Sequence, residues 1–346
     1  MRLTHVRPTD PGHTRVRHGR GFRYLDPAGR PLRDPAEVAR IKALVIPPAW
    51  RDVWICTRPD GHLQAVGTDA AGRRQYLYHP AFRAQQEEAK HDRVLEVAEA
   101  LPKVREAVEA GLGDGTGGLT RARVLATAVR LLDLGFFRIG SERYADLHQT
   151  YGLTTLLREH AGCHADEIVI SYPAKHGRQR VHAVADPATR RALAALRRRR
   201  SGGERLLAYR NGRSWHDLTG ADVNDYLRDL AGLDVTAKDF RTWHATVLAA
   251  VGLAVSRSVA PEEAARRRAV ARAVREVADY LGNTPAVCRN SYINPRVIEL
   301  YEEGVTVAAA LPHLGAAAPH GLPATVGPAE RAVLRMLRAD RPGGAA

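Results

Sequence analysis

The residues best suited to chemistry are a single tyrosine and a set of separated cations. Tyr292 lies in the segment LGNTPAVCRNSYINP, which contains no acid, no histidine and no metal-ligand pattern. Apart from Cys288, this tyrosine is the strong nucleophile candidate of the segment. Cleaving a phosphodiester without a metal requires a side-chain nucleophile, cations or donors on the non-bridging oxygens, and a proton donor for the leaving oxygen.

Candidates for the other roles are spread along the chain. Arg138 stands in FFRIGSERY, Lys175 in PAKHG and Arg241 in KDFRTWH, while Asn283 precedes Tyr292 by nine residues. Each has an ordinary structural alternative, such as a helix-end salt bridge, a solvated hairpin tip, a surface arginine or a core aromatic. Arg138 and Arg241 lie among apolar or aromatic neighbours, where an unpaired guanidinium is costly to bury, and this favours a function for them.

The overall charge indicates a polyanionic partner. The 346 residues include 52 basic and 38 acidic side chains, for a net charge of +14, so we expect nucleic acid or, as the weaker alternative, a membrane surface. Only five of the basic residues are lysines, and lysine, unlike arginine, can give up its proton in a site. Three cysteines without CxxC spacing fit a reducing cytoplasm. No signal-peptide core or membrane-length apolar run is present, so we expect a cytoplasmic protein.

Three motif-like patterns do not lead to a cofactor or a different catalytic class. GDGTGG follows a predicted helix, whereas a dinucleotide-binding loop follows a strand. No GK[ST] pattern for a phosphate loop occurs. HAGCH lacks a second pair of ligands at matching spacing, and the neighbours in SWHD point apart, unlike the members of a catalytic triad. The sequence therefore predicts no cofactor and no metal.

The elements that must position these residues fall into two parts. Residues 20–79 read as short antiparallel strands separated by PAG, PDG and AAG turns, interrupted by one helical stretch. The period then becomes helical, apart from EIVISYPAKHGRQRVHAVAD, which alternates like a β hairpin. We predict an α+β protein, with a small antiparallel-β N-terminal domain over 1–85 and a larger, mostly helical catalytic domain over 86–346.

Five segments in one order carry a family resemblance. They are GTDAAGRRQYLYHP, FFRIGSERY, PAKHG, KDFRTWHAT and LGNTPAVCRNSYINP. Together they resemble the type IB DNA topoisomerases, specifically the short poxvirus-like and bacterial branch, over about residues 20–310. The resemblance implies that the two domains form a clamp around duplex DNA, and that the protein relaxes supercoils as a monomer without ATP or metal.

The resemblance also implies a role for each candidate. Tyr292 matches the nucleophile that forms a 3′-phosphotyrosyl link, and Arg138 and Arg241 match the arginines that hold the non-bridging oxygens. Lys175 matches the hairpin lysine that protonates the leaving 5′ oxygen. Asn283 stands where poxvirus and eukaryotic relatives usually carry histidine, and its amide can donate a hydrogen bond but cannot shuttle a proton.

Further residues match family positions that contact DNA. Gln75, Tyr76 and Tyr78 lie on one predicted strand, with the two tyrosines on one face and Gln75 on the other. Tyr144 and Lys238 match positions near the scissile phosphate. Ordinary strand and helix patterning is the alternative interpretation of these residues.

Two other functions compete with this prediction. A tyrosine recombinase shares the Arg, Lys and Tyr chemistry, but the resemblance of GRRQYLYHP to a topoisomerase N-terminal domain argues against it. A non-catalytic basic DNA-binding protein would not need Tyr292. We expect a nucleoid-associated isomerase.

Overall fold

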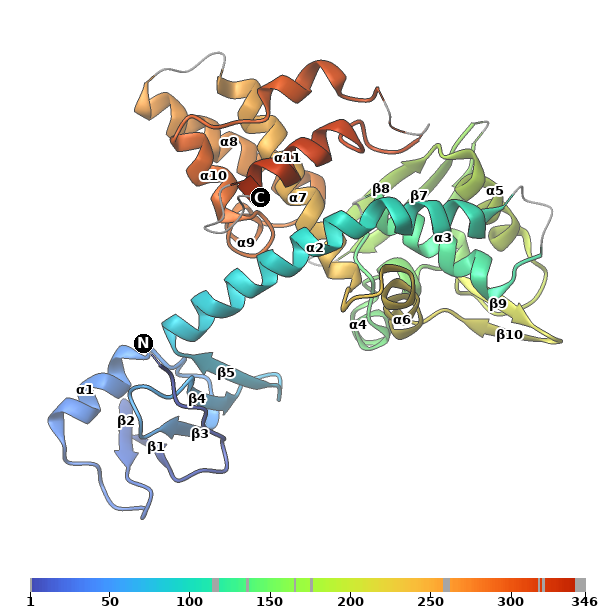
Figure 1. The fold of residues 1–346 in the computed structure, drawn as a ribbon. Helices are drawn as coiled ribbons and strands as arrows, with labels where there is room; N and C mark the ends of the chain where they lie inside the picture. Colours follow the sequence, from blue (N-terminus) through green and yellow to red (C-terminus); the bar gives the residue numbers. More distant parts are fainter. Residues whose placement is uncertain are drawn as a thin grey trace. The chain divides into compact units, whose positions relative to one another are not determined.

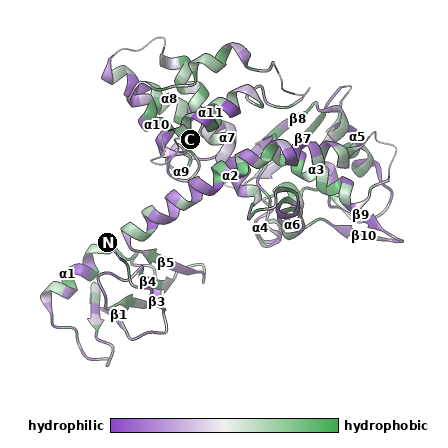
Figure 2. Ribbon diagram, in the orientation of Figure 1, coloured by the Kyte–Doolittle hydropathy of each residue, from purple (hydrophilic) through white to green (hydrophobic). Residues whose placement is uncertain are grey.

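The computed structural model describes residues 2–113, 118–134, 137–164, 166–174, 177–257, 262–316, 318 and 321–339. Contacts within the chain separate it into two compact units, Met1–Asp92 and Arg93–Ala346 (Figure 1). The division falls inside helix α2 (Pro80–Leu112), beyond the domain boundary expected at residue 85. Hydrophilic residues predominate along the N-terminal half of this helix (Figure 2).

The first unit is built on a five-stranded antiparallel sheet in the order β2-β1-β3-β4-β5. Its elements are β1 (Gly12–His18), β2 (Gly21–Leu25), α1 (Pro35–Ala43), β3 (Arg51–Cys56), β4 (Leu63–Thr68) and β5 (Arg74–Tyr78). Asp34 caps α1 by accepting from the Ala36 amide, and Pro35 occupies the first turn, where its missing N–H costs nothing. A small core that includes Ile41, Ile55 and Ala65 joins helix and sheet.

The second unit is mainly helical. Its remaining helices are α3 (Arg121–Asp133), α4 (Glu142–His148), α5 (Pro187–Arg198), α6 (Gly220–Ala231), α7 (Ala237–Arg257), α8 (Glu263–Leu281), α9 (Pro285–Ser291), α10 (Pro295–Glu302) and α11 (Pro328–Ala339), with 3₁₀ turns η1 (Leu153–Thr155), η2 (Arg158–His160) and η4 (Ala308–His313). Every residue of α3 from Arg123 to Asp133 is buried, which places this helix at the centre of the unit. The expected order of an antiparallel sheet followed by a mostly helical region is confirmed.

The second unit contains more sheet than the single hairpin expected. The hairpin of β7 (Ile168–Ala174) and β8 (Arg178–Val184) gains a third strand, β6 (Ala161–Cys163), and a separate hairpin joins β9 (Ala208–Asn211) to β10 (Ser214–Asp217). The SWHD segment is therefore a strand, with His216 stacked on Tyr209. Short polar strands of this kind lack the apolar alternation that identifies strands in a sequence.

Neither a membrane-spanning helix nor a metal-binding cluster occurs among the described residues. No helix there is both long and apolar enough to cross a membrane. Over the same residues, no group of three or more His, Cys, Asp and Glu side chains could hold a metal ion.

Candidate active site

The centre of the site is the C-terminal end of α8. Gly282 ends the helix in the left-handed conformation, with φ of 66°. The main-chain N–H of Asn283 donates to the Ala278 carbonyl at 2.8 Å. Thr284 then caps α9, with Pro285 in its first turn. Because the chain turns here, the carbonyls of Leu281 and Gly282 are left for side-chain donors.

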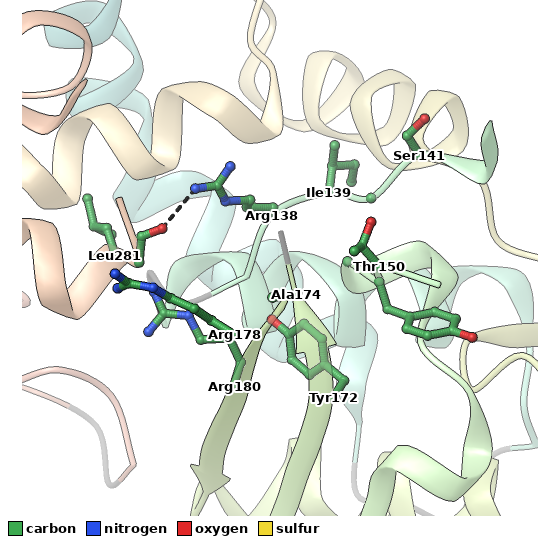
Figure 3. Close-up of a pocket in the computed structure, with 13 residues that line it drawn as sticks. Arg138, Ile139, Ser141, Thr150, Tyr172, Ala174, Arg178, Arg180 and Leu281 are labelled. Carbon is green, nitrogen blue, oxygen red and sulfur yellow. Dashed lines mark hydrogen bonds between the residues drawn. The ribbon is translucent and has the colours of Figure 1, made fainter. Parts of the chain in front are cut away.

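Two arginines bind these consecutive carbonyls. Arg241 of α7 is 3% exposed and donates through Nη2 to the Leu281 carbonyl at 2.6 Å. Arg138 donates through Nη2 to the Gly282 carbonyl at 3.0 Å and to Asn283 Oδ1 at 2.5 Å, and Figure 3 shows the first of these bonds. Helix carbonyl ends carry partial negative charge, so this end of α8 holds the two guanidinium groups side by side.

Tyr292 is brought to the same place by the turn between α9 and α10. Its amide donates to the Cys288 carbonyl at 3.0 Å, which ends α9. Thr246 of α7 donates through Oγ1 to the Thr242 carbonyl at 2.8 Å, lies 3.3 Å from the Tyr292 carbonyl and accepts from the Asn294 main-chain amide at 3.1 Å. The Arg241 Cζ lies 5.6 Å from the centroid of the Tyr292 ring. The phenol and the buried guanidinium are therefore neighbours, and both are fixed to α7.

Cys288, the other nucleophile candidate of the segment, does not suit that role. Its side chain is fully buried, and burial raises the pKa of its thiol to about 11. Since the thiolate is the reactive form, this cysteine is inert at neutral pH. The geometry supports Tyr292 as the nucleophile.

The Asn283 side chain has a donor available. Only its oxygen can accept from Arg138, so its Nδ2 faces away from that guanidinium. Within the described part of the chain this Nδ2 is buried and has no hydrogen-bond partner. A buried amide donor without an acceptor is unfavourable, and an anion placed beside Arg138 would provide the acceptor.

Positive charge dominates the electrostatics of the site. Burial lowers the pKa of Arg241, as does the nearby Arg138, while the contact with Tyr292 acts in the opposite direction. An arginine remains charged at neutral pH even after such a shift. Burial, followed by the charges of Arg180 and Arg241, also lowers the pKa of His182 to about 4, so this histidine is neutral at pH 7.

The low pKa of His182 makes stability depend on pH. Between its unfolded pKa of about 6.5 and its folded value of about 4, the unfolded chain binds more protons, so acid destabilises the fold. We expect the free energy of unfolding to fall on the order of 3 kcal/mol from this residue as pH drops through that window. Denaturant unfolding followed by circular dichroism at pH 7, 5.5 and 4.5 measures it. His182→Gln should show a shallower loss, and an identical loss would contradict the assignment.

The backbone that carries Arg138 is tightly held. The Leu153 amide donates to the Arg138 carbonyl at 2.7 Å, and a Cβ on Gly152 would lie 2.5 Å from the Gly140 Cα. Only glycine permits this approach. The resulting loop forms one wall of a cavity of about 290 Å³, which Tyr172 and Arg180 border from the hairpin (Figure 3).

A buried charge network lies under α7. Arg105 of α2 pairs with Asp133 of α3 at 2.8 Å and with Glu330 of α11 at 2.6 Å, and Glu330 also accepts from Trp243 Nε1 at 3.0 Å. His244 Nε2 lies 3.6 Å from Asp133, whose pKa is held well below its usual range by Arg105. Because Trp243 and His244 closely follow Arg241, this network fixes the helix that carries the catalytic arginine candidate.

The expected DNA contacts of the first unit lie on β5. Tyr76 and Tyr78 are 46% and 40% exposed on one face of the strand, with ring centroids 6.2 Å apart and planes at 13°. Gln75 faces the other way and donates to Asp69 at 2.9 Å. Tyr78 also lies against Phe82, with ring centroids 5.3 Å apart, and the exposed parts of both tyrosine rings favour them as contacts, whereas the Gln75 amide is already engaged.

Three further candidates, Lys238, Tyr144 and Lys175, were predicted from the sequence, and the structure describes the side chain of the first of them. Lys238 is exposed in the first turn of α7, one turn before Arg241. Tyr144 belongs to α4, but its side chain lies outside the described part of the structure. Lys175 also lies outside the described residues, between the paired ends of β7 and β8 at Ala174 and Arg178. The roles of these residues stay predictions.

Sequence reasoning overlooked three residues that the structure brings to the site. Arg178 and Arg180 alternate along β8 and border the cavity beside Arg138, and Thr246 holds the Tyr292 turn. The RQR pattern of the strand was the available signal for the arginines, because residues two apart on a strand share a face. A buried threonine on a helix has no comparable signal.

Comparison with known proteins identifies two matching families. Residues 79–309 match the eukaryotic DNA topoisomerase I catalytic core, and residues 21–69 match the N-terminal domain of bacterial DNA topoisomerase IB. The first match contains Arg138, Arg241, Asn283 and Tyr292, and together the two matches span both compact units.

Relatives agree with these matches. A protein of Acanthamoeba polyphaga mimivirus named DNA topoisomerase 1B is 26% identical over 273 residues, which cover 77% of this chain and 80% of that protein. The DNA topoisomerase 1B of vaccinia virus (strain Copenhagen) is 23% identical over 244 residues, which cover 69% and 72% respectively. Since the catalytic-core family spans well over half of the residues, the chain belongs to the type IB DNA topoisomerase family.

Proposed function

We propose that this protein relaxes supercoiled duplex DNA through a transient covalent link between Tyr292 and a DNA phosphate. The observation that carries the proposal is the convergence of two guanidinium groups and an unsatisfied amide donor beside the Tyr292 ring. Such a group of donors matches the charge that develops on the non-bridging oxygens of a five-coordinate phosphorus.

The proposed step conserves the phosphodiester bond energy. The Tyr292 phenol gives its proton to water as its oxygen forms a bond to phosphorus, and the bond from phosphorus to the 5′ oxygen breaks, giving a 3′-phosphotyrosyl link. Lys175 gives its proton to the departing 5′ oxygen, which leaves as a hydroxyl. Rotation of the free end releases supercoils, and attack of the 5′ hydroxyl on the phosphotyrosine restores the strand. No ATP is consumed because one ester replaces another.

The two arginines exchange partners when DNA enters. In the free protein they donate to the carbonyls of Leu281 and Gly282, which are weaker acceptors than a phosphate. Planar guanidinium groups suit the pair of non-bridging oxygens, and the carbonyls keep Arg138 and Arg241 close to the positions they need. The proposed site is therefore already organised before substrate binds, which lowers the cost of reaching the transition state.

We propose that both units of the chain contact the duplex. The two units would close on the duplex as a clamp, with Tyr76 and Tyr78 contacting it from the first unit and with Gln75, Tyr144 and Lys238 as further contacts. We propose that one copy of the chain suffices and that the protein acts on the nucleoid in the cytoplasm.

A plasmid assay tests the activity. Supercoiled plasmid is incubated with the protein in EDTA without ATP, and the products are separated on an agarose gel. A ladder of relaxed topoisomers is expected. Recombined or catenated products would instead favour a recombinase, and bound but unchanged plasmid would favour a non-catalytic DNA-binding protein.

Lys175→Ala should slow cleavage by about 10²–10⁴-fold, the usual contribution of general acid catalysis. Replacing the 5′ bridging oxygen with sulfur should restore the rate, because a thiolate leaves without protonation. Single-turnover cleavage of the two substrates measures the effect. If the sulfur substrate shows the same defect, Lys175 is not the proton donor.

Substitutions of Asn283 separate donation from proton transfer. Asn283→Ala removes the amide donor and should lower the cleavage rate about 10²–10³-fold, whereas Asn283→His keeps a donor and should remain active. Single-turnover cleavage rates of both variants provide the comparison. Equal defects in the two variants would show that more than a hydrogen bond is required at this position.

A further inference from the structure

The cavity beside Arg138 receives two arginines from one face of the β7–β8 hairpin. Tyr172 pairs with Arg180 and Ala174 with Arg178 in the antiparallel register, and all four side chains border the cavity. Figure 3 shows the guanidinium groups of Arg178 and Arg180 directed towards Leu281. The hairpin therefore adds positive charge next to the two arginines already described.

Arg180 differs from the structural arginines of the same unit. Arg105 and Arg130 both pair with carboxylates, the first with Asp133 and Glu330 and the second with Asp186. Arg180 is half-buried, yet in the described part of the chain it forms no ion pair with a carboxylate, and its Nη1 donates to the Asp279 carbonyl at 3.4 Å. Burial lowers the pKa of Arg180, and the charges of Arg138 and Arg178 act in the same direction. Tyr172 and the Asp279 carboxylate act in the opposite direction, but among the described residues neither forms an ion pair with Arg180.

The Arg180 side chain occupies the space that a side chain at position 282 would take. A Cβ on Gly282 would lie 1.2 Å from the Arg180 Nη2, and Gly282 also adopts a φ of 66°. Arg180 consequently rests against the same residue whose carbonyl binds Arg138. Any other residue at 282 would displace the guanidinium and strain the turn.

We propose that Arg180 binds a DNA backbone phosphate adjacent to the phosphate held by Arg138 and Arg241, an inference that rests on the proposed function. A DNA strand presents one negative charge at each successive phosphate. Of the four guanidinium groups around the end of α8, those of Arg138 and Arg241 are directed at one phosphate, and Arg180 is the hairpin arginine that lies against Gly282 beside them. Arg180 acts in this proposal as a binding residue rather than a catalytic one.

Binding measurements isolate the contact from the chemistry. All variants carry Tyr292→Phe, so that no covalent step occurs, and binding of a fluorescent duplex is followed by anisotropy across a salt series. Arg180→Ala should bind about tenfold more weakly at low salt. Its slope of log affinity against log salt should be shallower by about 0.9, the value for one lost phosphate contact. Arg180→Lys should keep most of the slope.

The matched control removes the same charge elsewhere. Arg228 of α6 is paired with Asp225 on the surface, so Arg228→Ala should leave both affinity and slope close to the parent. Unfolding curves of every variant check that the fold is retained. A slope for Arg180→Ala equal to that of Arg228→Ala would overturn the proposal.

Replacing single phosphates with neutral methylphosphonates locates the contact. Each phosphate flanking the scissile one is replaced in turn, and binding by the parent and by Arg180→Ala is compared. At one flanking position the replacement should weaken the parent but not Arg180→Ala, because the interaction is already lost. If every replacement weakens both proteins equally, Arg180 contacts no flanking phosphate. Failure of the plasmid assay alone would reject the proposed activity and leave this binding result standing.

Discussion

Tyr292→Phe should bind duplex DNA with nearly unchanged affinity and form no covalent adduct. The substitution removes one oxygen and leaves the ring against Arg241, so the fold and the cation cluster are retained. Loss of a catalytic nucleophile elsewhere lowers turnover on the order of 10⁶-fold, which sets the expected size. The measurement is a denaturing gel of protein mixed with end-labelled duplex, on which the adduct migrates as a slow band.

Another tyrosine supplies the control. Tyr301 is 2% exposed in α10, and in the described region its hydroxyl has no hydrogen-bond partner. Tyr301→Phe therefore makes the same chemical change at little cost to stability and should form adduct at the parental rate. Adduct formed by Tyr292→Phe would show that another side chain attacks the phosphate.

Arg241→Ala should lower the cleavage rate by about 10³-fold or more, since arginines that stabilise a transferring phosphoryl group contribute about 10³–10⁵. Arg241→Lys restores charge but not the planar pair of donors, so we expect a rate between those of Arg241→Ala and the parent. Single-turnover cleavage of a nicked suicide duplex, whose short leaving strand cannot religate, measures the chemical step separately from binding.

The same substitution removes a buried hydrogen bond. Arg241→Ala leaves the Leu281 carbonyl without its 2.6 Å donor and opens space beside α8, so part of any loss comes from the fold. Unfolding curves and duplex affinity distinguish the two effects. A variant that is folded, binds DNA normally and cleaves at the parental rate would remove Arg241 from the transition state.

Some of this architecture could be predicted from local patterns. Turn signals and alternation predicted the antiparallel N-terminal sheet, and the helical period predicted the second region. Thr219 directly precedes α6, a position typical of a helix cap, and its Oγ1 accepts from the Asp222 main-chain amide at 3.1 Å. Such features depend on neighbours in the chain, which a sequence displays directly.

The organisation of the site depends on contacts that a sequence does not display. Arg138 and Arg241 donate to the main-chain carbonyls of Gly282 and Leu281. Because every residue has a main-chain carbonyl, the sequence does not indicate which residues accept these bonds. Arg180 was missed for a related reason. Its significance comes from the absence, in the described part of the chain, of an ion pair with a carboxylate, which only packing reveals.

The buried network under α7 has a consequence for biosynthesis. Arg105 and Glu330 are separated by 225 residues, and α11 lies beyond the segment that matches the catalytic-core family. During synthesis from the N-terminus, Arg105, Asp133 and Trp243 emerge from the ribosome long before the carboxylate that joins them. A nascent chain that already contains Tyr292 therefore still lacks the acceptor of the Trp243 indole. The support beneath the Arg241 helix is therefore completed only after Glu330 has emerged, well after the residues of the site itself.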